Sequence, residues 1–216
     1  MKKGLYLLCF VFLAACGHLP DIRQPDLGRM PAGCDIFPQG RWQFVHSIEA
    51  TPPDGSRQTM LGVLQLSPSD RTIRCVMLTV EGLVLFEAYY DGAVHIQRAV
   101  PPLDRPGLGE GLIRDLLLIF FAPEQPLTQS GQLENGDRIC RFRLPDGGTQ
   151  DIAIQPTGDW TLRRYNAWQR VTRTVHGESD GQGSSLGFPA RLVLQAHGWL
   201  GYQLTMSLLE VEPLDD

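Results

Sequence analysis

The chain has 216 residues, of which 43% are apolar and 20% are charged. This length and composition predict one folded domain with a sizeable core, and they exclude a chain dominated by low-complexity disorder. The formal net charge of −5 argues against a nucleic-acid-binding protein, which needs an excess of basic residues to contact phosphates. Both lysines lie within the first three residues, so a chain without its N-terminus would be more acidic still.

The N-terminus has the pattern of a bacterial export signal. Two lysines are followed by an apolar run that is too short to span a membrane. The run ends in LAAC, which resembles the lipobox of bacterial lipoproteins, in which cleavage precedes lipidation of the cysteine. We therefore expect residues 1–15 to be a signal peptide, Cys16 to be lipidated, and no transmembrane helix to be needed. By the same resemblance Gly17 indicates the periplasmic face of the outer membrane. The alternative is an ordinary secretory signal.

Residues 17–40 contain four prolines with glycines between them and show no period of 2 or 3.6 residues. Together with Cys16 they predict a proline-rich tether over residues 16–40, which holds the folded domain off the membrane. The domain itself is expected over residues 41–212, followed by a short acidic tail at 213–216.

Strand patterns begin after the tether. Apolar and polar residues alternate from Trp42 to Glu49, and the turn PPDGS leads into a second alternating segment. Short turns rich in Gly, Asp, Ser and Pro join the segments that follow. The pattern predicts a five-stranded meander, with strands near residues 41–49, 57–67, 71–80, 83–90 and 93–100.

One long helix interrupts the strands. From Gly107 to Ala122 apolar residues recur at helical spacing, whereas Glu110, Arg114 and Asp115 cluster elsewhere. A proline before the segment suits a first helical turn, and Pro123 prevents its continuation. The helix must therefore bury one broad face.

Strands return after a connection over residues 123–136. They are expected near residues 137–144, 149–155, 160–168, 171–175, 188–197 and 202–211, which brings the total to about eleven. An antiparallel sheet this wide must curl or close to cover its apolar face. We therefore predict a mainly β fold, an antiparallel half-open barrel of about eleven strands with the inserted helix as lid or plug.

Three of the five cysteines would remain in the folded part of a lipidated chain, namely Cys34, Cys75 and Cys140. In an oxidising compartment an odd number permits at most one internal disulfide and one spare thiol. Spacing alone does not define the pairing. Cys140 shares an apolar strand face with Phe142 and Leu144, which favours a buried free thiol there.

Strands, an inserted helix and a terminal hairpin behind a lipobox together resemble the lipoprotein-localisation (Lol) carrier and receptor family. The resemblance covers residues 41–211 and is strongest to the lipidated outer-membrane receptor and to uncharacterised lipoproteins grouped near it. Residues 76–97 are similar to the receptor's strand, turn and strand, whose turn bears an exposed leucine that inserts lipoprotein into the membrane. By position Val80 and Leu83 are the matching apolar residues. The chain lacks the receptor's proline before that leucine, and a proline-rich tether replaces its N-terminal helix.

The resemblance implies a half-barrel that holds acyl chains of a lipid or lipoprotein against its concave face, with a periplasmic carrier protein as a further partner. An acyl chain also needs a dry groove on physical grounds, because each exposed methylene costs ~0.8 kcal/mol in water. The alternative is a filled core in a protein that only docks onto another envelope protein. A filled core would have the same sequence pattern as a lipid-binding groove. The candidate lining residues are Trp42, Phe44, Met60, Leu64, Phe86, Leu116, Phe120, Phe142, Leu162, Leu204 and Met206.

An esterase is the third interpretation. Residues 183–187 match the G-x-S-x-G pattern with Ser185 as nucleophile, but the segment is a polar loop without the strand and helix that such a nucleophile needs. His197 follows with no acidic residue between, so the usual order of a catalytic triad fails. The five histidines show no ligand spacing, and His46 is expected to be a hydrogen-bonded core residue. We therefore expect no catalysis, no metal and no cofactor.

Overall fold

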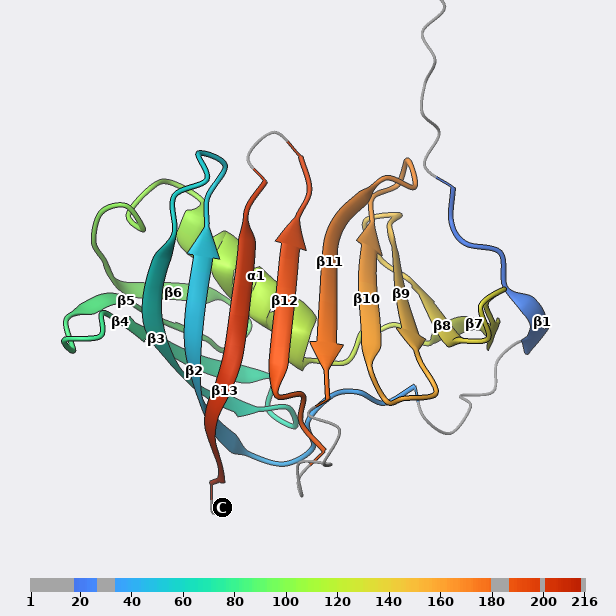
Figure 1. Cartoon of the computed structure of the whole chain (residues 1–216), viewed down its shortest axis with the longest axis horizontal. Coiled ribbons are helices and arrows are strands. Elements are labelled where there is room, and N and C mark those ends of the chain that lie inside the picture. The colour runs from blue at the N-terminus through green and yellow to red at the C-terminus, as the bar shows by residue number, and fades with distance from the viewer. Residues whose placement is uncertain (1–17, 27–33, 180–186, 199–200, 215–216) are drawn as a thin grey trace, which may run out of the picture.

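A computed structural model describes residues 18–26, 34–179, 187–198 and 201–214 (Figure 1). In this part of the chain one helix accompanies a single antiparallel sheet of thirteen strands. The elements are β1 (Arg23–Asp26), β2 (Trp42–Thr51), β3 (Gln58–Ser67), β4 (Thr72–Leu78), β5 (Val84–Tyr90), β6 (Val94–Ala99), α1 (Leu108–Phe120), β7 (Leu127–Gln132), β8 (Arg138–Arg143), β9 (Thr149–Ile154), β10 (Trp160–Tyr165), β11 (Val171–Glu178), β12 (Arg191–Ala196) and β13 (Gln203–Pro213).

The strands follow the order β1-β7-β8-β9-β10-β11-β12-β13-β2-β3-β4-β5-β6. The predicted meander is confirmed as β2 to β6, and the second run of predicted strands is confirmed as β8 to β13. Antiparallel pairing of β13 with β2 joins the two runs. The sheet is therefore continuous from its first edge strand, β1, to its last, β6.

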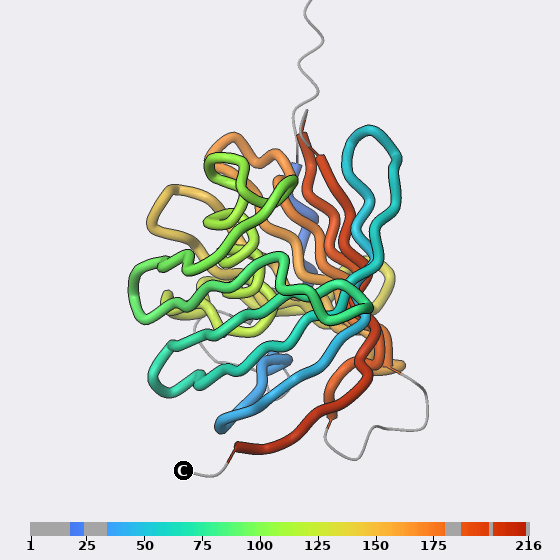
Figure 2. Tube along the Cα trace, turned by 90° about the vertical axis from the view of Figure 1, so that its left-hand side faces the viewer, coloured from blue at the N-terminus to red at the C-terminus, as the bar shows by residue number. Residues whose placement is uncertain are grey.

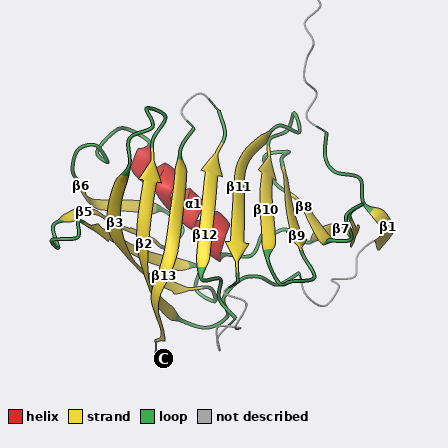
Figure 3. Ribbon diagram, in the orientation of Figure 1, coloured by secondary structure: helices red, strands yellow, loops and turns green. Residues whose placement is uncertain are grey.

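The sheet is strongly curved, as the predicted half-open barrel requires. In Figure 1 β2, β13 and β12 run vertically, whereas β4, β5 and β6 cross the molecule, because each strand is twisted relative to its neighbour. Figure 2 shows the same curvature from the side. Figure 3 shows α1 as the one helix among the described residues, lying on the concave side of the sheet.

Two strands were missing from the prediction, and they pair with each other. β1 is antiparallel to β7 and β7 to β8, so both lie at one edge of the sheet. Their sequences, RQPD and LTQSGQ, lack the alternation that identifies a half-buried strand. Short polar edge strands of this kind discourage pairing with other chains.

The segment before β2 is also more ordered than a tether. Cys34 and Phe37 are buried in the main hydrophobic core, and Arg141 of β8 donates a hydrogen bond to the Pro20 carbonyl at 2.9 Å. The tether expected over residues 16–40 is therefore wrong for residues 34–40, which pack against the domain. Proline and glycine content wrongly predicts an extended tether here, because the few apolar residues of the segment pack into the core of the domain.

A disulfide joins Cys34 to Cys140 of β8 across 106 residues of sequence. The prediction of a free thiol at Cys140 is thus wrong, although its burial is confirmed. Cys75 on β4 is the buried free thiol instead, and burial raises its pKa to about 12. The disulfide fixes the N-terminal segment to the concave face of the sheet, which the pairing of β1 with β7 alone would not do.

α1 begins after Gly107, whose φ of 79° belongs to the left-handed region that suits glycine. Glu110 lies in the first turn, where the helix dipole favours an acidic side chain. The helix ends at Phe120, and the next residue, Phe121, has an extended conformation. One detail of the prediction is wrong: Asp115 is buried and does not share the polar side with Arg114, which is exposed.

Candidate functional site

The concave face of the sheet is a continuous apolar surface. Residues that pair across neighbouring antiparallel strands project to the same face. One row across five strands consists entirely of buried or half-buried aliphatic side chains, and the other rows continue it toward β2, β3 and β5. This row is Leu204, Leu194, Val175, Leu162 and Ile152.

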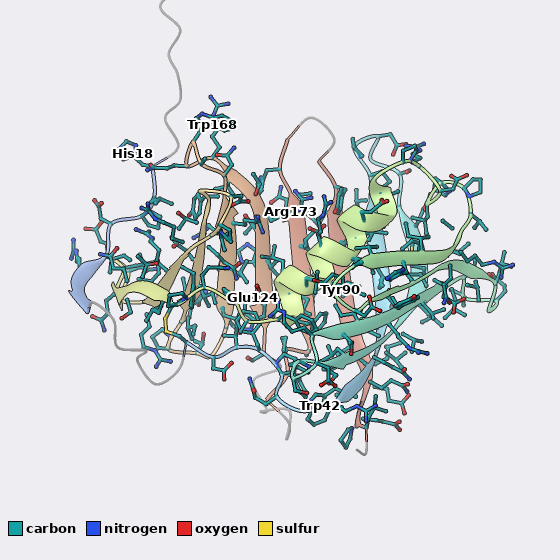
Figure 4. The ribbon with its side chains drawn as sticks, turned by 180° about the vertical axis from the view of Figure 1, so that it is seen from behind. His18, Trp42, Tyr90, Glu124, Trp168 and Arg173 are labelled. Carbon is teal, nitrogen blue, oxygen red and sulfur yellow. A yellow bond between two sulfur atoms is a disulfide. The ribbon has the colours of Figure 1, made fainter. Side chains whose placement is uncertain are left out.

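α1 covers this face. In Figure 4, which views the molecule from behind, the helix lies diagonally across the sheet. Phe120 at its C-terminal end packs on Phe44 of β2, with ring centroids 5.5 Å apart. Gly109 at its N-terminal end approaches the sheet so closely that an added Cβ would lie 2.5 Å from the Ile96 Cδ1 atom and 3.0 Å from the Phe86 Cε2 atom. A side chain at this position would require Ile96 and Phe86 to shift.

His46 lies under the helix, between Phe44 and Phe120. Its burial confirms the prediction of a core histidine. Burial lowers the pKa of His46 from 6.5 to about 4, because a charged imidazole is poorly solvated among these rings. The side chain is thus neutral near pH 7 and serves packing beneath α1.

A buried polar cluster also fastens α1 to the sheet. Arg173 of β11 donates from Nε to the Asp115 Oδ1 atom at 2.8 Å. The Tyr202 hydroxyl donates to the other oxygen of the same carboxylate, and the Arg173 guanidinium lies 5.7 Å from the Tyr202 ring centroid. Burial raises the pKa of Asp115, although both partners act in the opposite direction. Asp115 is the one charged side chain of α1 that is buried among the described residues.

The structure brings the candidate lining residues into one hydrophobic cluster. Eight are buried and three are partly buried against them. With α1 in place these side chains belong to one buried cluster that includes residues of the helix. The buried residues are Phe44, Met60, Leu64, Phe86, Phe120, Phe142, Leu162 and Met206, and the partly buried ones are Trp42, Leu116 and Leu204.

A groove opens beside the helix, which we call the α1 groove. It has a volume of about 570 Å³ and runs between the C-terminal half of α1 and the segment that follows it on one side and strands β9 to β11 on the other. Its apolar walls include Leu117, Phe121 and Leu144, whereas its polar lining includes four arginines and three acids. Figure 4 labels Arg173 and Glu124, which lie beside the helix within this groove. The prediction missed the groove altogether.

The four arginines are Arg71, Arg114, Arg164 and Arg173, and the acids are Asp115, Glu124 and Asp146. Three of the arginines have carboxylate partners: Arg173 has Asp115, Arg164 has Asp146 at 2.6 Å, and Arg71 has Glu124 at 2.9 Å. An arginine at the centre of an apolar strand face, between Val171 and Val175, was the one signal in the sequence that could have indicated this site.

The β4–β5 turn presents two apolar side chains to solvent. Val80 is 67% exposed and Leu83 is 61% exposed. Apolar side chains of this size at the tip of a hairpin have no packing role in the domain. The structure thus shows that both side chains are accessible at the tip of the hairpin.

Two sequence predictions lie outside the described residues: the lipidation of Cys16 and the nucleophilic role of Ser185. His197, the histidine considered for the esterase, is hydrogen-bonded to Thr174 at 2.8 Å. Among the described residues no helix is long and apolar enough to cross a membrane. The same residues contain no group of three or more His, Cys, Asp or Glu side chains arranged to hold a metal ion.

Comparison with known proteins identifies the fold. No family model matches the sequence, and no curated protein does. A solved LolA superfamily protein from Nitrosomonas europaea matches with a TM-score of 0.53 and 10% identity, over 83% of this chain and 88% of that one. A domain assigned as an outer membrane lipoprotein-sorting protein from Vibrio parahaemolyticus gives a TM-score of 0.49 and 10% identity, over 80% and 85% of the chains. The first match, together with the curled antiparallel sheet and its inserted helix, shows that the chain has the fold of the LolA superfamily.

Proposed function

We propose that this protein is a lipoprotein of the outer membrane, anchored through Cys16 and facing the periplasm, that binds acyl chains of a lipid or lipidated cargo. Binding would serve transfer to the outer membrane or insertion in it. A periplasmic carrier protein is the expected donor. The observation that carries this proposal is the apolar concave face of the sheet, which is covered by a single helix rather than by a second layer.

α1 is suited to act as a movable cover. It is connected to β6 and β7 through loops, so it can leave the sheet without breaking any strand pairing. The side chains beneath it, such as Phe44 and Phe86, would then contact acyl chains in place of Phe120 and its neighbours. A chain of sixteen carbons gains on the order of ten kcal/mol on transfer from water at ~0.8 kcal/mol per methylene, which can offset the contacts of the helix.

The polar cluster of Asp115, Arg173 and Tyr202 supports the closed state. A buried carboxylate that pairs with a guanidinium has a defined geometry and fixes the helix in one position. In the open state Arg173 and Asp115 would be hydrated separately. The cluster thus sets a free-energy threshold that a lipid must exceed before α1 moves.

Burial of these side chains in one cluster with α1 favours a second candidate function, a docking or assembly lipoprotein with a filled barrel that binds no lipid. Replacement of Leu116 and Phe120 by Ala distinguishes the two. In a permanently filled core each change should cost about 2 to 5 kcal/mol of the free energy of unfolding and do little else. If α1 is a movable cover, the double variant should instead alter lipid capture more than stability.

Native mass spectrometry of the full chain, purified from bacterial membranes in a non-ionic detergent, tests the proposal. We expect lipid to be retained by the purified protein or taken up when added. A protein that binds neither co-purified nor added lipid would favour the docking function.

Cys16→Ala should abolish incorporation of labelled palmitate, and persistence of the label would refute the anchor. Ester hydrolysis by the unmodified chain that disappears in Ser185→Ala would support the esterase interpretation.

A further inference from the structure

The sheet wall of the α1 groove contains a row of hydrogen-bond donors. Arg173 of β11 pairs with Arg164 of β10, and Arg164 pairs with Gln150 of β9. Directly paired residues of antiparallel strands have Cβ atoms about 5 Å apart on the same face. Two guanidinium groups and an amide therefore project side by side into one groove, although the rest of this concave face is mainly apolar.

Adjacent arginines on a sheet repel each other, so this row needs negative charge nearby. Asp115 and Asp146 supply it, and each binds one arginine. A guanidinium has five N–H groups. Asp146 accepts from Nη2 of Arg164, and Arg173 uses its Nε and Nη1 atoms for Asp115 and a backbone carbonyl. Both side chains thus retain donors for a further acceptor in the groove.

Gln150 gives independent evidence for a missing acceptor. Its side chain is 4% exposed and lines the groove. The Nε2 atom of its amide is buried and has no hydrogen-bond partner. It is the one buried side-chain nitrogen or oxygen in this condition among the described residues. An unsatisfied buried donor costs free energy, and a ligand oxygen would relieve that cost.

The opposite wall of the groove adds one more cation. Arg114 of α1 lines the groove, is exposed, and has no ion pair among the described residues. Beside it Leu117 and Phe121 continue toward the apolar interior. The donors are thus at one end of an apolar surface, which is the arrangement that an amphiphile with an anionic head requires.

We propose that the sheet wall of the α1 groove, formed by Gln150, Arg164 and Arg173, binds the phosphate of an anionic lipid headgroup, while the acyl chains of the same lipid take the place of α1 on the concave face beside it. Several arginines with an amide donor suit a tetrahedral phosphate, because guanidinium groups bind its oxygens with two parallel hydrogen bonds. This inference rests on the proposed function, since it defines the class of lipid that the half-barrel takes.

The test compares three probes on the full chain in non-ionic detergent by native mass spectrometry. Dioleoylphosphatidylglycerol and dioleoylglycerol have the same acyl chains, and only the first carries a phosphate. Inorganic phosphate alone is the third probe. We expect the phospholipid to bind about tenfold more tightly than the diglyceride, the difference typical of one charge-assisted hydrogen bond, and inorganic phosphate to bind more weakly than the phospholipid.

Two variants connect that difference to the groove. Arg164→Ala and Gln150→Leu should each reduce phospholipid affinity about tenfold and leave diglyceride binding unchanged. Gln150→Leu should not reduce stability, because it removes an unsatisfied buried donor. The matched control is Arg98→Ala, which removes an exposed arginine of β6 outside the groove and should change neither affinity.

Each other outcome has a definite meaning. Equal binding of the two lipids, or phospholipid affinity unaffected by both groove variants, would refute the headgroup site and leave the proposed function intact. Inorganic phosphate that binds as tightly as the phospholipid would show a site for free phosphate and refute the lipid assignment. Failure of both lipids to bind would refute the proposed function, and the inference with it.

Discussion

A larger side chain between α1 and the sheet should increase lipid affinity if the helix is a movable cover. Gly109→Val places side-chain atoms where the helix approaches β5 and β6. Even a Cβ atom there would lie 2.5 Å from the Ile96 Cδ1 atom and 3.0 Å from the Phe86 Cε2 atom. Ile96 is 40% exposed and can move, but Phe86 is fully buried. The valine must therefore displace the N-terminal end of α1 from the sheet.

The magnitude follows from the cost of overpacking, about 1 to 3 kcal/mol for added methyl groups at a tight contact. If closure competes with lipid binding, the same free energy appears as improved apparent affinity. The expected gain is about 5- to 150-fold. Gly111→Val is the matched control, because it makes the same change in helix propensity and nothing lies within 4 Å of a Cβ at that position.

The assay is equilibrium binding of dioleoylphosphatidylglycerol to both variants and to the unmodified chain, together with thermal unfolding. Relative to Gly111→Val, the Gly109→Val variant should unfold at a lower temperature and bind lipid more tightly. A lower unfolding temperature with unchanged or weaker lipid binding would refute the reasoning. In that case α1 would be a permanent part of the core.

The remaining predictions concern the disulfide, a buried histidine and the exposed turn. Replacement of Cys34 and Cys140 by Ala should reduce the free energy of unfolding by about 4 to 5 kcal/mol, as expected for a closed loop of this length; a loss below about 1 kcal/mol in urea titrations would contradict it. Unfolded His46 gains a proton below pH 6.5, whereas the folded side chain does so only near its lowered pKa of about 4. Stability should therefore fall by about 3 kcal/mol as the pH decreases through this window, and urea titrations of His46→Leu should lack that decrease. Glutamate at both Val80 and Leu83 should change stability by less than about 0.5 kcal/mol but slow delivery of lipid to vesicles, and delivery at the original rate would exclude the turn from insertion.

The sequence predicted α1 and the strands that contain alternating residues. Helical spacing of apolar residues between Gly107 and Pro123 located the helix to within two residues of its ends. The strands β2 to β6 and β8 to β13 have one face toward solvent and one toward the core. Apolar residues therefore recur at every second position along them. Both patterns extend over neighbouring residues only, so they can be recognised in a single sequence.

The missed features depend on partners far apart in sequence. β1 and β7 are strands because they pair with each other at the edge of the sheet. Neither sequence has alternating apolar and polar residues, so neither strand can be predicted from its own sequence. The apolar strand face of Cys140 predicts a free thiol there. Nothing local indicates that Cys34, which precedes it by 106 residues, lies beside it. Long-range pairing decides such features, and spacing along the chain does not specify it.

The α1 groove was missed for the same reason. Arg164, Arg173 and Gln150 belong to three separate strands, and no local pattern in the sequence connects them. Only the register of β9, β10 and β11 places the three side chains in one row. Helical periodicity predicts Asp115 on the polar side of its helix, because it does not reveal that Arg173 lies on the opposing sheet.

Displacement of α1 by lipid is the central claim, and hydrogen–deuterium exchange of the full chain measures it most directly. With dioleoylphosphatidylglycerol bound, we predict faster exchange of the backbone amides of α1, while the amides of β12 and β13 remain as protected as before. Faster exchange would show that acyl chains replace the helix on the concave face. Lipid binding with α1 equally or better protected would contradict the account, because the lipid would then bind without opening the half-barrel.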